Sequence, residues 1–260
     1  MASALLVAGC GSAAEPITPF PSESHWQPGL VGLSQYPPQG LGPDPSVTPS
    51  PSAAPTIVDP TLDDPTQAAL APLGLQPADV TSDLIVAPIE GGTTLEGGPT
   101  LDLCGGSFPS EALRVTRRQV AAFTAAGAPV GLSTEVVRYE SETAAAEAMA
   151  ELVAARKGCP EGVPVTVGTT TTTFTFHPAP GPSDVPLVDA DNRVVVHSTV
   201  VRDSGTRHLL VVYQRIGSVI VGLYAAADGA GPFDQASLDS TFILAGRIAD
   251  RMRAASGTSA

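Results

Sequence analysis

The chain has 260 residues, 43% of them hydrophobic and 15% charged, and its 13 basic and 26 acidic side chains give a formal net charge of −13. Lys and Arg side chains bind nucleic acid by displacing the counterions of its phosphates. Because this chain has few of them, we expect no nucleic-acid partner. No apolar run reaches the roughly 18 to 20 residues of a membrane-spanning helix, which argues against a chain that crosses a bilayer by itself. Twelve of the 26 acidic residues precede Arg114, the first basic residue, so an acidic front is attached to a nearly neutral body.

The first ten residues end in a tetrad, Val7-Ala8-Gly9-Cys10, that resembles the lipobox of bacterial lipoproteins. In a lipobox, small residues precede a cysteine whose thiol carries the diacylglycerol. We therefore predict a signal segment over 1–10, lipid attachment at Cys10 and a place on the extracytoplasmic face of a cell membrane. Because a signal peptide needs a basic start and a longer apolar run, we expect the true start to lie upstream of Met1. A chance run of small residues in a cytosolic protein is the open alternative.

The next segment, 11–65, is rich in proline, and thirteen of the 26 prolines fall between Pro16 and Pro65. Proline removes backbone donors, and this stretch has no apolar periodicity, so it cannot offset its ordering entropy. We predict a disordered, partly extended linker here and a folded domain over 66–260. The only tryptophan, Trp26, lies in the linker, where it is either a sparse contact in a flexible tether or an anchor for a partner.

The folded part begins with short helical turns at 67–70 and 77–80 and a strand at 84–89. The segment 113–125 fits both strand and helix, because its apolar alternation is interrupted. A second long strand is predicted over 130–139.

The clearest helix covers 142–157. Ser141 is a suitable N-cap, Arg156 and Lys157 lie in the last turn, and Gly158 follows. Its apolar stripe consists of Ala145, Ala148, Met149, Leu152 and Val153.

The remaining chain is rich in β-branched residues. We predict an exposed or edge strand over 163–176, then strands at 193–202, 207–216 and 219–227. A two-residue turn at Gly217-Ser218 would place Tyr213 opposite Gly222 and Val212 opposite Leu223. The strand 207–216 is apolar on both faces, so it should be central and covered by a last helix from near Asp234 to about Ala254. That helix would point six residues inward: Leu238, Thr241, Phe242, Ala245, Ile248 and Met252. The fold class is therefore α+β, an antiparallel sheet packed with helices.

Cysteine usage fits an exported protein. If Cys10 carries lipid, Cys104 and Cys159 remain as an even pair. In an oxidising compartment these two would pair, whereas in the cytosol they would be buried thiols. Neither belongs to a CxxC motif, so we expect no metal bound by cysteine.

Catalytic signatures are missing from the sequence: it has no GxSxG, HExxH, Walker or GxGxxG motif. The run Asp189-Ala190-Asp191-Asn192 begins like a calcium loop but lacks the required Gly and Glu. His197 and His208 share a hairpin face without a carboxylate partner, which favours core or surface residues over metal ligands. Ser107 and Ser110 have no evident base. We expect no cofactor, no metal and no catalytic activity.

Four arginines are the candidate ligand-binding residues: Arg114, Arg117, Arg118 and Arg138. On adjacent strands, some of these guanidinium groups would converge on a carboxylate or phosphate. The alternative is pairing with Glu111, Glu135 or Glu140, or simple solvation.

Four segments together resemble a known family. They are LDLCGGSFPSEALRVTRRQVAAF at 101–123, VVRYES at 136–141, the helix that ends in Gly158-Cys159, and the hairpin VVYQRIGSVIVGLYA. They resemble actinobacterial extracytoplasmic sensor-like domains of the PknH type. Over about 66–255, the resemblance implies an antiparallel sheet between helices, a Cys104–Cys159 disulfide and a ligand cleft. The kinase member of the family has two disulfides, whereas this chain has cysteines for one.

The sequence therefore favours a lipid-anchored, extracytoplasmic sensor-like or ligand-binding domain without catalysis. Its expected partners are the membrane, through the lipid, and a small ligand or an envelope protein. Two other classes stay open, namely an envelope hydrolase with an unrecognised site and a protein-interaction module that uses the Trp26 region.

Overall fold

The computed structural model describes residues 59–96, 98–101, 103–104, 106–167, 170–202, 205–228 and 231–257. The predicted lipid attachment at Cys10, the signal segment and Trp26 lie outside the described residues, as does most of the predicted linker. Asp59 and Thr61, which the sequence assigned to the linker, belong to the described part and contact Arg118 on the sheet.

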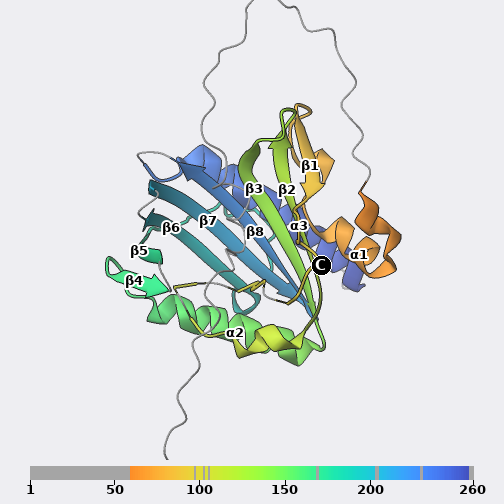
Figure 1. The fold of residues 1–260 in the computed structure, drawn as a ribbon, viewed down its shortest axis with the longest axis horizontal. Helices are drawn as coiled ribbons and strands as arrows, with labels where there is room; N and C mark the ends of the chain where they lie inside the picture. Colours follow the sequence, from red (N-terminus) through yellow and green to blue (C-terminus); the bar gives the residue numbers. More distant parts are fainter. Residues whose placement is uncertain are drawn as a thin grey trace, which may run out of the picture.

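One antiparallel sheet of eight strands organises the fold, in the order β1-β2-β3-β8-β7-β6-β5-β4 (Figure 1). The strands are β1 (Leu84–Pro88), β2 (Arg114–Thr124), β3 (Pro129–Tyr139), β4 (Pro164–Val167), β5 (Thr170–Phe176), β6 (Arg193–Arg202), β7 (Gly205–Ile216) and β8 (Val219–Asp228). The segment 113–125, which fitted both strand and helix, is strand β2 because β1 and β3 pair with it on both sides. The predicted strand 163–176 is in fact a hairpin of two strands, with β4 at the sheet edge.

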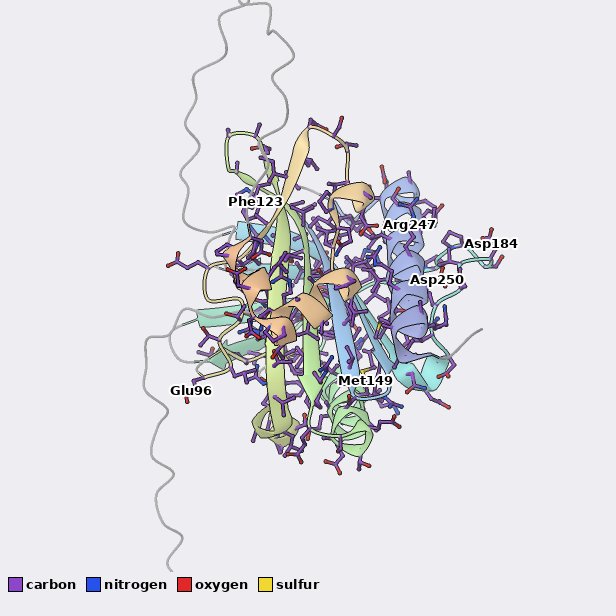
Figure 2. The ribbon with its side chains drawn as sticks, turned by 90° about the vertical axis from the view of Figure 1, so that its right-hand side faces the viewer. Glu96, Phe123, Met149, Asp184, Arg247 and Asp250 are labelled. Atoms are coloured by element: carbon purple, nitrogen blue, oxygen red, sulfur yellow. A yellow bond between two sulfur atoms is a disulfide. The ribbon has the colours of Figure 1, made fainter. Side chains whose placement is uncertain are left out.

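Within the described residues, three α-helices pack on this sheet: α1 (Pro65–Leu70), α2 (Glu142–Gly158) and α3 (Gln235–Ser256). Short 3-10 turns lie at Pro60–Asp63, Ala71–Leu73, Pro77–Asp79, Pro109–Leu113 and Ala190–Asn192. Local signals fix the long helices, since Ser141 caps α2 and Asp234 caps α3 through side-chain hydrogen bonds. Figure 2 shows α3 lying along one side of the sheet.

Two apolar cores result, one on each face of the sheet. The face toward α3 and α1, here the α3 face, buries Leu210, Val212 and Phe242, while the α2 face buries Val211 and Tyr213. Strand β7 is therefore covered on both sides, as its sequence predicted. The prediction named only the last helix as its cover, whereas α2 covers the opposite face.

The predicted details of these elements are confirmed. Tyr213 pairs with Gly222 and Val212 with Leu223, because a two-residue turn leaves only one register. All six residues that α3 was expected to point inward are buried. The fold is α+β, as predicted.

Candidate functional site

The predicted arginine group begins with Arg114, at the start of β2, whose side chain contacts the segment 95–100. Its Nη1 donates to the carbonyl of Gly98 at 2.7 Å and to Thr100 Oγ1 at 2.8 Å, and its Nη2 donates to the carbonyl of Leu95 at 3.0 Å. Its Nη2 also lies 3.2 Å from a carboxylate oxygen of Glu111. This guanidinium group holds a loop of the chain itself against the sheet.

Arg117 forms an ion pair with Glu135 in the interior of the α2 face. The two side chains are 0% and 1% exposed. Thr100 Oγ1 donates to Glu135 at 2.9 Å, the Tyr224 hydroxyl donates to it at 3.3 Å, and Arg117 Nη1 donates to the Thr94 carbonyl at 2.9 Å. Such a network is stable only when its members are paired, because an isolated buried charge is expensive.

Burial also acts on the carboxylates of this network. It raises the pKa of Glu135, while the adjacent Arg117 opposes that rise. Burial likewise raises the pKa of Glu111 against the opposing charge of Arg114. In both carboxyl groups the arginine partner lowers the pKa and so offsets part of the effect of burial.

The other two arginines lie on the opposite face of the sheet. Arg118 pairs with Asp59 and donates to Thr61 Oγ1 at 2.6 Å. Arg138 stands opposite Thr116 on the neighbouring strand, on the same α3 face. The four guanidinium groups therefore do not share one site. Arg114 and Arg117 make the pairs with Glu111 and Glu135 that the sequence left open, and a ligand-binding role for this group stays a prediction.

Cys104 and Cys159 form a disulfide in the structure, with Cα atoms 5.6 Å apart. It joins the end of α2 to the segment that precedes β2.

Two other residues considered in the sequence have structural partners. The hydroxyl of Ser110, considered above as a nucleophile, donates to Glu151 on α2 at 2.6 Å. Asp189 caps a 3-10 turn by accepting from the Asn192 backbone at 3.1 Å.

A proline-rich segment, residues 177–188, crosses the α3 face between β5 and β6, and we call it the strap. Several side chains fix it. Gln235 donates to the Pro180 carbonyl at 3.1 Å, Arg253 donates to the carbonyls of Pro186 and Leu187 at 2.9 Å, and Gln214 accepts from the Val188 backbone at 3.3 Å. The strap is anchored near both ends, so its middle forms a wall rather than a loose loop.

A cavity of about 270 Å³ lies between the strap, β6 and α3. Its lining residues are Ala179, Gly181, Pro182, Ser183, Val185, Leu187, Arg193, Val195 and Phe242. Gly181 allows the strap to lie on α3, since a Cβ atom there would stand 2.7 Å from the ring of Phe242. Gly181 and Ser183 are exposed, so the cavity is open to solvent and small solutes.

Three histidines gather where the strap begins. His177 Nε2 lies 2.7 Å from Thr199 Oγ1, which lies 3.0 Å from His208 Nδ1. His197 Nδ1 lies 2.7 Å from the Pro178 carbonyl, which can only accept, so this nitrogen carries the proton. Burial lowers the pKa of His177, and the nearby His197 and His208 lower it further. These contacts tie the strap to β6 and β7.

Neither a metal-binding cluster nor a membrane-spanning helix is found in the described part of the chain. Within it, no group of three or more His, Cys, Asp or Glu side chains is placed to hold a metal ion. The same residues include no helix long and apolar enough to span a bilayer.

The cavity was not predicted from the sequence, although its wall was recognised as a proline-rich loop. Four prolines in HPAPGPSDVPL, between two β-branched strands, were the available signal for a rigid crossing segment. Nothing in the sequence around Arg193, at the first position of β6, indicated a ligand-binding role. Its role depends on which residues the strap brings beside it.

No protein-family model matches the chain, and no curated protein matches it. Among solved structures, it is similar to the "Crystal structure of the extracellular domain of PknH from Mycobacterium tuberculosis", with 18% identity and a TM-score of 0.48. The match covers 74% of this chain and 97% of that one. A likeness of this degree carries no argument about what this chain binds or does.

Proposed function

We propose that this protein is a sensor-like ligand-binding domain on the extracytoplasmic face of a cell membrane, anchored by lipid on Cys10 and without catalytic activity. The segment 11–65 tethers the folded domain to that anchor. The ligand occupies the cavity between the strap, β6 and α3.

The cavity under the strap is the observation that carries this proposal. It is open to solvent, and it combines aliphatic and aromatic side chains with polar groups that include Arg193 and Ser183. Ligand sites typically combine apolar walls with a few polar groups, and they lie between elements of a rigid scaffold. The disulfide supports the extracytoplasmic location, because disulfides persist mainly in oxidising compartments.

The anchor is tested by fractionating a bacterial host that lipidates proteins and expresses the full chain with its own or a supplied signal peptide. We expect the protein in the membrane fraction and Cys10→Ala in the soluble fraction. Ser12→Ala is the matched control and should stay with the membrane. A Cys10→Ala variant that still sediments with the membrane contradicts the anchor.

Ligand binding is tested by a ligand-observed NMR screen of small metabolites against the full chain. Val195→Phe places a ring in the cavity and should abolish binding of any hit. Val201→Phe, on the same face of β6 but 46% exposed, is the control and should retain it. Hits that survive Val195→Phe would place the ligand elsewhere. Turnover of an ester, phosphate or glycoside substrate, lost on a single Ser or His substitution, would contradict the absence of catalysis.

A further inference from the structure

The cavity under the strap contains one charged side chain, Arg193. It stands at the start of β6, opposite Gln214, and its Nη1 donates to the Val188 carbonyl at 3.1 Å. That hydrogen bond fixes the guanidinium group at the cavity wall and uses one of its five N–H donors.

Among the described residues, Arg193 lacks the carboxylate partner that five other arginines have, namely Arg114, Arg117, Arg118, Arg251 and Arg253. Arg251, for example, forms an ion pair with Asp79, and Arg253 pairs with Asp250. Across the residues that the structure describes, no carboxylate lies within ion-pair distance of Arg193. A half-buried guanidinium group without an acidic partner favours an anion from outside the chain.

Two acidic residues in or next to the strap, Asp184 and Asp189, are directed elsewhere. Asp189 accepts from the backbone and the side-chain amide of Asn192, at 3.1 and 2.8 Å. Asp184 is exposed and projects from the strap into solvent (Figure 2). Neither neutralises Arg193.

The other lining residues of the cavity indicate which part of the ligand lies next to its anionic group. Leu187, Val195 and Phe242 present aliphatic and aromatic surface, and Ser183 adds a hydroxyl at the opening. A volume of about 270 Å³ is near the lower limit for ligand pockets, so the ligand is small. A single cationic side chain suits a singly charged group better than a phosphate, which needs several donors, and Leu187, Val195 and Phe242 offer contacts to an apolar body.

We propose that this cavity binds a small organic carboxylate, with Arg193 as the partner of the carboxylate and Phe242, Val195 and Leu187 around the apolar body. The proposal rests on the ligand-binding role proposed above and names the chemical class of the ligand.

The test uses hexanoate, its neutral counterpart 1-hexanol and inorganic phosphate as probes, titrated into the full chain by NMR. We expect hexanoate to bind with a Kd of about 1 mM and 1-hexanol about tenfold or more weakly, because one charge-assisted hydrogen bond is lost. Arg193→Gln should weaken hexanoate by a similar factor. Arg247→Gln, an exposed arginine on α3 (Figure 2), is the matched control and should leave the Kd unchanged.

Three results would overturn the assignment. Equal affinity for hexanoate and 1-hexanol, both lost in Val195→Phe, would keep the cavity as a ligand site but remove the carboxylate. Tighter binding of phosphate than of hexanoate would remove the apolar body. Binding of none of the probes would end the carboxylate proposal, while the metabolite screen would still decide the broader ligand-binding role. If Arg193→Gln does not fold, the comparison of hexanoate with 1-hexanol on the unsubstituted protein decides alone.

Discussion

The buried ion pair between Arg117 and Glu135 gives the sharpest prediction about stability. Its side chains are 0% and 1% exposed, so removal of either partner leaves a charge in the interior without its main counter-charge. Loss of one partner of a buried pair costs about 3 to 5 kcal/mol. We expect Arg117→Met and Glu135→Leu each to lower the free energy of unfolding by that amount at neutral pH.

The double variant Arg117→Met/Glu135→Leu measures the interaction energy between the two side chains, apart from their other contacts. It removes both charges together, so it should be more stable than the sum of the single losses indicates, by roughly 2 to 3 kcal/mol. Urea denaturation followed by circular dichroism measures all four corners of this cycle. Single losses below about 1 kcal/mol, or strictly additive losses, would refute the view that the pair is an interior network.

The pH dependence of Arg117→Met provides an independent check on Glu135. Burial raises the pKa of this carboxyl from its usual 4.5 and Arg117 opposes the rise, so the variant should have a still higher folded-state pKa. A raised carboxyl pKa means that the folded protein binds a proton before the unfolded chain does. Its stability is then full below pH 4.5 and declines as the pH rises through the folded-state pKa. The deficit of Arg117→Met relative to the parent should therefore shrink as the pH falls from 7 toward 4.5, and a constant deficit would contradict this account.

Three further predictions concern other parts of the fold. Replacement of Cys104 and Cys159 by serine should lower the unfolding free energy by about 4 kcal/mol, since the bridge closes a loop with a sequence separation of 55; calorimetry without reductant would detect this. Gly181→Ala should cost about 1 to 3 kcal/mol in urea denaturation, because its Cβ atom would stand 2.7 Å from the buried ring of Phe242. The lowered pKa of His177 means that the unfolded chain takes up its proton first, so stability should be full above pH 6.5 and fall below it. His177→Asn should lose that part of the decline in thermal melts, and an unchanged pH profile would contradict it.

The elements that were predictable from the sequence are those with local causes. Helix α3 repeats its apolar residues with the helical period, and its inward residues were named correctly for that reason. The register of β7 with β8 follows from a two-residue turn. Strand β2 was ambiguous because its apolar alternation is interrupted, and it is a strand because β1 and β3 pair with its two edges, which its own residues do not encode.

The arginine group shows why a site is harder to predict than a strand. Simple alternation along β2 places Arg114 and Arg118 on one face and Arg117 on the other. The register shifts between Arg114 and Thr116, so Arg114 stands opposite Tyr139 and joins Arg117 on the α2 face. An irregularity of one residue reverses the face of every residue before it, and the sequence carries no clear sign of it.

Ion pairs in the structure explain part of the uneven charge distribution along the chain. Asp59, Asp79 and Glu111 belong to the acidic front, and each forms an ion pair with an arginine of the body. Part of the front therefore neutralises the sheet and α3 rather than remaining in solvent. An external anion would compete with these internal carboxylates at Arg114, Arg118 or Arg251, whereas at Arg193 it would meet no such competitor among the described residues. For that reason, we place the proposed carboxylate site at the strap rather than at the arginine group that the sequence first suggested.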